Sequence, residues 1–232
     1  VAAPELYETA VRLAQQYGFI VLNDFAYAGL EFGSTRSLSL LETPGALDVA
    51  LELGSLSKMY MVAGWRGGFV AGNAEVLAAV KAVHRQTAVL ASSVIQQAGA
   101  VALESDQSTG AALAVQSQHR LEVVRDGFTQ AGLPVSEAQG GLFAWAKVPE
   151  RWGSAGVHDG TVSEVRVTDG SADLANNSAA FVDWLLKTAG VALMPGSCFG
   201  KAGEGWVRIS LLKHTAELFQ AAARVSRALQ DK

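Results

Sequence analysis

The hydrophobic positions of the chain form short segments that alternate between helical and strand-like spacing. In residues 4–17 apolar side chains recur every three or four positions, which predicts an amphipathic helix that ends at Gly18. Residues 19–22 are continuously apolar, so they predict a strand buried on both faces, as in a parallel sheet. Two further short apolar runs predict strands at 49–54 and 68–71.

Longer helical patterns follow, and the spacing changes again after Pro134. Helices are predicted at 73–84, 91–103, 108–131, 178–189 and 215–229, and strands at 142–148, 191–194 and 206–211. A segment rich in Gly, Ser and Asp, 149–173, predicts a loop or hairpin. Alternating strands and helices indicate an α/β architecture. We expect two domains, an α/β part at 1–115 and a smaller α+β domain at 116–232.

The composition narrows the function classes. Half of the 232 residues are hydrophobic and 17% are charged, which excludes a disordered chain. A net charge of −4 without a basic run argues against nucleic-acid binding. No apolar stretch approaches the roughly 20 residues that span a bilayer, so no membrane partner is expected. The one cysteine, Cys198, forms no internal disulfide, which favours a reducing, cytoplasmic setting. Histidines are scattered, and no metal-ligand spacing is found.

The segment 54–68 concentrates reactive and cationic side chains directly after a predicted strand. It contains Ser55, Ser57, Lys58 and Arg66 among glycines and apolar residues. A lysine and an arginine at a strand end are most often surface charges. Here two hydroxyls and a planar guanidinium suit a phosphate group, and the lysine beside them is a potential amine nucleophile. This combination is what a phosphate-bearing aldehyde cofactor requires.

A second group of polar residues follows the first predicted strand. Asp24 lies at its carboxyl end, where ligands of α/β sheets bind. An aspartate at this place is commonly a turn residue that caps the next element. The functional interpretation is a carboxylate that faces a ring nitrogen and favours the protonated pyridinium. Tyr27, three residues later, has a hydroxyl that can donate to a ring oxygen.

These two segments resemble the pyridoxal-phosphate-dependent aminotransferases of fold type I, class I/II. The resemblance lies in Asn-Asp-Phe-Ala-Tyr at 23–27 and in Ser-Leu-Ser-Lys at 55–58, followed by Arg66. Two more stretches, 195–200 and 203–211, support it. The best-fitting group contains LL-diaminopimelate aminotransferase and related alanine or aspartate transaminases. The resemblance implies a mostly parallel sheet flanked by helices, an incomplete large domain, and a smaller α+β C-terminal domain.

The resemblance also implies roles for individual residues. Lys58 would form the aldimine with pyridoxal 5'-phosphate and then act as the general base. Asp24 would pair with the pyridine nitrogen, and Tyr27 would hydrogen-bond the phenolic oxygen.

The remaining implied roles concern anionic groups. Ser55, Ser57 and Arg66 would hold the cofactor phosphate. Arg208 would bind the substrate α-carboxylate, although a lone arginine on a strand is often only a surface residue.

The activity implied is amino transfer between an amino acid and a 2-oxo acid by a ping-pong mechanism, in a homodimer. Two alternatives remain open. One is a β-lyase on the same fold, and the other is a non-catalytic aminotransferase-like module that binds a ligand or a partner. Retention of Lys58, Asp24, Tyr27 and Arg66 argues against the second alternative. The sequence does not identify the amino donor.

Family members have an N-terminal portion that precedes the position of Val1, including an Asn-Pro-x-Gly block. From the motif order we expect this chain to be the C-terminal part, roughly three-fifths of the enzyme. The missing portion would contain phosphate-binding amides and an aromatic side chain that stacks on the ring. The chain alone is therefore expected to be inactive.

Overall fold

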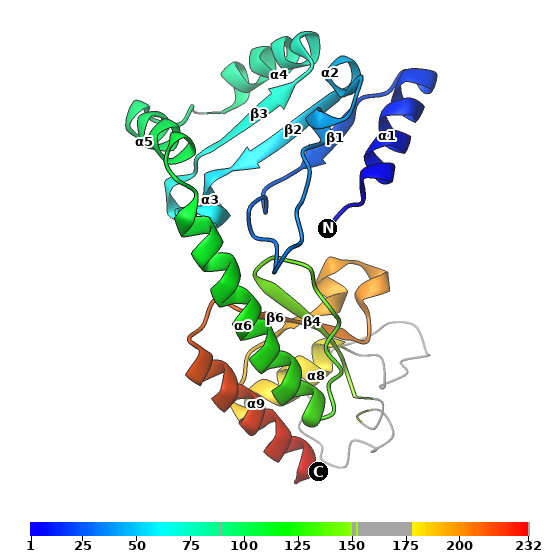
Figure 1. Cartoon of the computed structure of the whole chain (residues 1–232). Helices are drawn as coiled ribbons and strands as arrows, with labels where there is room; N and C mark the ends of the chain where they lie inside the picture. Colours follow the sequence, from blue (N-terminus) through cyan, green and yellow to red (C-terminus); the bar gives the residue numbers. More distant parts are fainter. Residues whose placement is uncertain (89, 150–151, 153–177, 232) are drawn as a thin grey trace. The chain divides into compact units, whose positions relative to one another are not determined.

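The computed structural model describes residues 1–88, 90–149, 152 and 178–231, which form two compact units (Figure 1). The first unit comprises residues 1–116 with 139–141, and the second comprises 117–138 with 142–232. The boundary falls inside one helix, α6 (Ser108–Gln130), after Gln116. The division into domains at 1–115 and 116–232 stays a prediction.

A three-stranded sheet forms the centre of the first unit. Its strands are β1 (Val21–Asp24), β2 (Ala50–Ser55) and β3 (Gly68–Gly72), in the order β1-β2-β3. β1 and β2 are parallel, whereas β2 and β3 are antiparallel. The three predicted strands are confirmed, with the first displaced by two residues toward the C-terminus. The parallel pair makes the carboxyl ends of β1 and β2 meet at one edge.

The prediction that the first strand is buried on both faces is wrong. Leu22 is 61% exposed, and the flanking Phe19 and Ile20 are 44% and 45% exposed. β1 is an edge strand of the described sheet, and only alternate residues along it face the α1 side. Val21 packs there against a cluster of buried side chains. The members of this cluster are Val11, Leu40, Ala46 and Ala50.

Helix α1 (Pro4–Tyr17) forms as predicted and packs on β1 and α2 (Ala46–Val49) (Figure 1). Proline is tolerated in its first turn because the missing N–H has no helical partner there. Gly18 ends the helix in the left-handed conformation, with φ of 70°, and its N–H donates to the carbonyl of Ala14. Glycine adopts this conformation without the Cβ clash of other residues.

Glu52, in the middle of β2, is a buried carboxylate that joins three parts of the first unit. One of its oxygens, Oε2, accepts from Asn23 Nδ2 on β1 at 2.9 Å and from the backbone N–H of Leu40 at 2.8 Å. The other, Oε1, accepts from the Ser39 hydroxyl at 2.7 Å. Because buried charge is costly unless it is hydrogen-bonded, this arrangement fixes β1, β2 and the 39–42 turn together.

The first unit contains further helices besides α1 and α2. They are α3 (Leu56–Met59), α4 (Ala74–Thr87), α5 (Ser93–Glu104) and the first part of α6, with 3₁₀ turns at Leu40–Glu42 and Ala63–Trp65. Of these helices, α4 contacts β3. The long helices confirm the predictions, and side chains of Asn73 and Ser92 cap α4 and α5. The short helices were not predicted. Before α6, Asp106 accepts hydrogen bonds from the Ser108 side chain and backbone, which lower the pKa of its carboxyl group.

The second unit contains an antiparallel sheet with helices packed on it. Its strands are β4 (Phe143–Lys147), β5 (Met194–Pro195) and β6 (Trp206–Ser210), in the order β4-β6-β5. α8 (Ser178–Ala189) contacts this sheet and α9 (Thr215–Gln230) (Figure 1). The strand predicted at 191–194 is wrong over 191–193, since pairing there begins only at Met194. Most of the predicted loop at 149–173 lies outside the described residues.

The two faces of this sheet differ in burial. Along β4 and β6 every second residue is buried, namely Ala144, Ala146, Val207 and Ile209. The alternate positions are half-buried or exposed. Large buried side chains of the helices complete the core on the packed face, including Phe128, Phe181, Leu185 and Val225. The second face is therefore open to a ligand, a partner or solvent.

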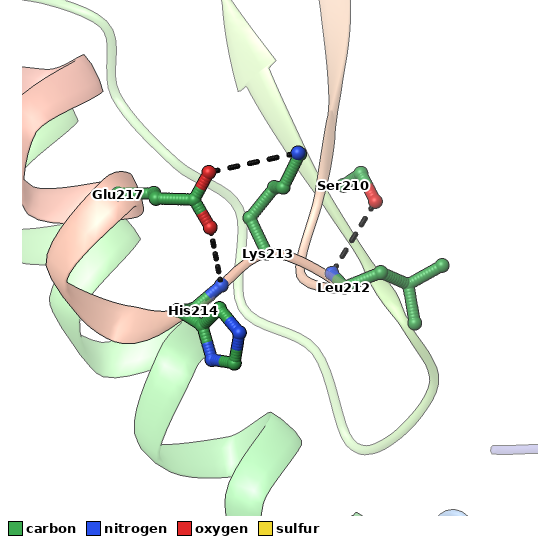
Figure 2. Close-up of polar contacts among 5 residues, drawn as sticks. All are labelled: Ser210, Leu212, Lys213, His214 and Glu217. Carbon is green, nitrogen blue, oxygen red and sulfur yellow. Dashed lines mark hydrogen bonds and ion pairs between the residues drawn. The ribbon is translucent and has the colours of Figure 1, made fainter.

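A network of polar contacts fixes the turn from β6 into α9 (Figure 2). Leu212 N–H donates to the Ser210 hydroxyl at 3.3 Å, and His214 N–H donates to Glu217 Oε2 at 3.2 Å. Lys213 Nζ lies 3.6 Å from Glu217 Oε1. Capping of the first turn of α9 in this way satisfies backbone donors and fixes where β6 ends. None of the described helices is long and apolar enough to cross a membrane.

Replacement of Glu52 by alanine is expected to destabilise the protein by about 3 kcal/mol, because it leaves the buried Leu40 N–H and two side-chain donors without an acceptor. Chemical denaturation measures the change. Glu104→Ala is the matched control, since Glu104 is exposed at the end of α5. Equal stability of the two variants would contradict the role given to Glu52.

Candidate functional site

The predicted polar residues of the first unit gather where β1 and β2 end. Asp24 is the last residue of β1 and pairs in register with Leu53, and Ser55 is the last residue of β2. The backbone N–H of Phe25 continues the ladder to the carbonyl of Leu53 at 3.0 Å. Asp24 and the segment that begins at Ser55 therefore leave the sheet at the same edge.

Lys58 lies on the short helix α3 that follows β2 directly. Ser55 is its N-cap, and the Ser55 hydroxyl oxygen accepts from the backbone N–H of Ser57 at 3.2 Å. The N–H of Leu56 donates to the carbonyl of Gly67 at 3.2 Å, so the chain returns to the start of α3. Ser55, Ser57 and Lys58 are all half-buried. This geometry presents two hydroxyls and the amine from a single helical turn.

The amine of Lys58 also reaches the segment that follows β1. Its Nζ lies 5.5 Å from the centre of the Tyr27 ring, over the ring face. Tyr27 is 40% exposed. A lysine ammonium within about 6 Å of an aromatic ring centre is attracted by the negative face of the ring. The structure thus brings together Lys58 and Tyr27, two of the residues selected from the sequence.

Asp24 makes the turn contact expected from its position, whereas its role opposite a ring nitrogen stays a prediction. Its Oδ1 accepts from the backbone N–H of Ala26 at 3.2 Å, which is the turn-capping contact. The side chain is exposed, and no hydrogen bond or ion pair involving Oδ2 is found in the described part of the chain. A turn contact at one oxygen leaves the other available to a ligand.

Arg66 lies in a left-handed backbone conformation, with φ of 57° and ψ of 43°. Met61, on the same connection, also has a positive φ, of 56°. Such conformations cost about 1–3 kcal/mol in residues other than glycine, and they concentrate at functional sites. The Arg66 side chain is exposed, and one of its nitrogens, Nη1, donates to the carbonyl of Ala63 at 2.9 Å. The remaining N–H groups of the guanidinium suit an anion.

Close packing of α5 fixes the position of α3. A Cβ added to Gly99 would lie 2.8 Å from Leu56 Cδ1, and one added to Gly67 would lie 3.1 Å from the same atom. Glycine at these two positions therefore lets the Leu56 side chain pack closely without a shift. Beside it lies an open, mostly apolar groove lined by α3, α5 and the connection between Lys58 and Arg66, including Tyr60 and Trp65. Trp65, directly before Arg66 in the chain, therefore lies at this groove.

Arg208 belongs to the second unit, on the open face of β6. It is half-buried, and its guanidinium carbon lies 4.1 Å from the centre of the Phe143 ring and 4.7 Å from that of Phe199. In the described part of the chain, no hydrogen bond or ion pair to the Arg208 side chain is recorded. Its donors remain available, as binding of a carboxylate requires.

Sequence reasoning missed Glu52, Phe143 and Phe199. The signal for Glu52 was a lone carboxylate within an apolar strand, which is a costly placement unless the charge has partners. The two phenylalanines gave no sequence signal, because their relation to Arg208 depends on pairing between distant strands.

The donor set of the first unit fits pyridoxal 5'-phosphate in its chemistry. A carboxylate, Asp24, suits a protonated pyridine nitrogen, and an amine, Lys58, suits the aldehyde. Hydroxyls at Ser55 and Ser57 and the Arg66 guanidinium suit the phosphate. Among the described residues no group of three or more His, Cys, Asp or Glu side chains is arranged for a metal ion, and Cys198 is exposed.

Comparisons with known proteins agree with this chemistry. The family model "Aminotransferase class I and II" matches residues 1–225. The chain is 34% identical over 227 residues, 98% of its length, to "L-glutamine--4-(methylsulfanyl)-2-oxobutanoate aminotransferase" of Bacillus subtilis, of which it covers 51%. It is 32% identical, over 97% of its length, to LL-diaminopimelate aminotransferase of Syntrophobacter fumaroxidans, of which it covers 52%.

A solved structure extends the comparison to the fold. The aromatic aminotransferase of Pyrococcus horikoshii superimposes with a TM-score of 0.82 at 26% identity, over 100% of this chain and 56% of that one. The chain therefore spans about half the length of the relatives it matches, rather than the three-fifths expected from motif order.

Proposed function

This chain belongs to the class I and II aminotransferase family, and we propose that it forms part of an enzyme that moves an amino group from an amino acid to a 2-oxo acid. The observation that carries the proposal is the convergence of Lys58, Ser55, Ser57 and Tyr27 beside Asp24 at one sheet edge. The family and its fold type I structures depend on pyridoxal 5'-phosphate.

Each side chain has a task in this proposal. Bound pyridoxal 5'-phosphate supplies an aldehyde for amines and a ring that withdraws electrons from the substrate. Lys58 Nζ would hold the cofactor at its aldehyde carbon, and as a free amine it would move the proton at the substrate α-carbon. Asp24 keeps the ring nitrogen protonated, and the Tyr27 hydroxyl donates to the phenolic oxygen.

The remaining residues bind the anionic groups of the cofactor and the substrate. The Ser55 and Ser57 hydroxyls and the Arg66 guanidinium hold the phosphate. In the second unit, Arg208 binds the substrate α-carboxylate with two parallel hydrogen bonds, for which its unpaired donors are suited. Arg208 contacts only the carboxylate, which all amino acids share. Other residues must therefore recognise the side chain of the amino donor.

The names of the two relatives indicate different amino donors, so the substrate class is proposed only as amino acids and 2-oxo acids. We propose in addition that the protein acts as a cytoplasmic homodimer. The family resemblance supports the dimer, and the single cysteine is consistent with a reducing compartment. Light scattering of the whole gene product measures the oligomeric state.

The whole gene product is expected to transfer the amino group of an amino acid to a 2-oxo acid, without release of ammonia. Lys58→Ala should abolish this activity, because no other group replaces the amine at that position. The control is Lys81→Ala, since Lys81 is exposed on α4. A panel of amino donors with 2-oxoglutarate provides the assay. Ammonia release without an acceptor would instead identify a lyase, and full activity of Lys58→Ala would contradict the proposed role of Lys58.

Asp24→Asn is expected to lower kcat by about ten- to thousandfold, since loss of an opposite charge shifts a partner's pKa by about 1–3 units. Asp48→Asn is the control, because Asp48 is an exposed aspartate of the same unit. Steady-state kinetics and the pH dependence of the cofactor absorbance measure the effect. Unchanged kinetics in Asp24→Asn would show that the carboxylate serves only as a turn cap.

A further inference from the structure

Aromatic rings surround Arg208 on the open face of the second unit's sheet. Arg208 on β6 is paired in register with Trp145 on β4, and Phe143 lies two positions along β4 on the same face. Successive residues of a strand point to opposite faces, so Phe143, Trp145 and Arg208 share one face. This is the half-buried face, and the alternate residues form the packed core.

The guanidinium of Arg208 lies over two of these rings. Its central carbon is 4.1 Å from the Phe143 ring centre and 4.7 Å from that of Phe199, which ends the 3₁₀ turn Gly196–Phe199. Trp145 supports Phe199 by an edge contact at 5.6 Å and stacks on Trp206 at 6.1 Å. Rings from β4, β6 and the turn thus form one layer that contacts the cation.

Contact with a ring orients a guanidinium without using its hydrogen-bond donors. The attraction acts on the flat face of the group, whereas its five N–H groups point outward in the guanidinium plane. A neighbouring carboxylate would orient the same group but would occupy two donors. Within the described chain, Arg208 has ring contacts and no recorded acceptor.

The second unit offers a contrast in Arg120. It is only 7% exposed, and its Nη1 donates to the carbonyl of Leu211 at 3.0 Å. This arginine is therefore committed to the backbone that follows β6. Two arginines of one unit are held in different ways, one by a backbone acceptor and one by rings alone.

We propose that Phe143 and Phe199 are positioning residues that hold the Arg208 guanidinium in a fixed orientation, with its donors free for a substrate carboxylate. The proposal rests on the function proposed above, which gives Arg208 the carboxylate. Phe143 fixes the group from the neighbouring strand, and Phe199 fixes it from the turn. Loss of either ring allows the long side chain more rotamers, which weakens bidentate binding.

The experiment uses the whole gene product and measures binding of glutarate, a carboxylate without a reactive carbonyl, by isothermal titration calorimetry. Phe143→Leu and Phe199→Leu should each weaken glutarate binding about two- to fivefold, as expected for loss of one cation–ring contact. Phe143→Tyr and Phe199→Tyr keep the ring and should bind within about twofold of the unsubstituted protein. Arg208→Lys, which loses the planar fork, should bind most weakly.

The matched control is Phe219→Leu, because Phe219 is 67% exposed on α9 of the same unit. It should leave the affinity unchanged. Steady-state kinetics should agree, with KM for the 2-oxo acid raised in the two leucine variants and kcat unchanged. A general loss of structure would lower kcat and the melting temperature instead.

Leucine variants that bind glutarate as tightly as the unsubstituted protein would overturn the proposal. So would tyrosine variants as weak as the leucine variants, or an equal loss in Phe219→Leu. If glutarate binds equally well to Arg208→Lys, or not at all to the unsubstituted protein, Arg208 is not the carboxylate site and the inference also fails. The aminotransferase assignment is tested separately at Lys58 and would be unaffected by that result.

Discussion

The candidate site depends on the parallel pairing of β1 with β2. This pairing brings the carboxyl end of one strand, with Asp24, next to that of the other, with Ser55. Phe25 extends the ladder by one more hydrogen bond, and Glu52 joins β2 to Asn23 on β1 through its buried carboxylate. A different register would separate the carboxylate from the lysine helix. Sheet pairing thus determines which polar side chains meet.

In the second unit, too, strand pairing determines which side chains lie together. Its antiparallel register sorts side chains into a packed face and an open face, and Arg208 falls on the open one. The rings that contact Arg208 orient its charge, and the turn into α9 is capped by Glu217, which limits where β6 ends. Under the proposed function, the first unit supplies an amine with groups suited to a phosphate, and the second unit supplies an arginine suited to a carboxylate.

Much of this fold was predictable, because local patterns determine it. The spacing in α1 and the glycine that ends it suffice to define that helix, and α8 was predicted at its observed bounds. The exposure of Leu22 was not predictable, because a continuous run of apolar residues does not reveal whether one face or both faces of the strand are covered. The short helix α3 also escaped prediction, since its four residues leave no periodic signal.

The residues of the candidate sites also divide into those that the sequence predicted and those that it did not. Lys58, Asp24, Tyr27 and Arg66 were selected as candidates from residue types that follow strand ends and from the family resemblance, and their roles stay predictions. Phe143 and Phe199 were not selected, because contacts with Arg208 arise from pairing between β4 and β6 and from the turn before β6. Information of this kind depends on tertiary register rather than on local sequence.

The most direct test of the central claim is to map the lysine that binds pyridoxal 5'-phosphate. The whole gene product would be incubated with the cofactor, reduced with borohydride, digested and analysed by mass spectrometry. The account predicts a reduced pyridoxyl group on Lys58 and none on the exposed Lys81. A modified lysine elsewhere, or no modification of Lys58, would contradict the assignment of this site.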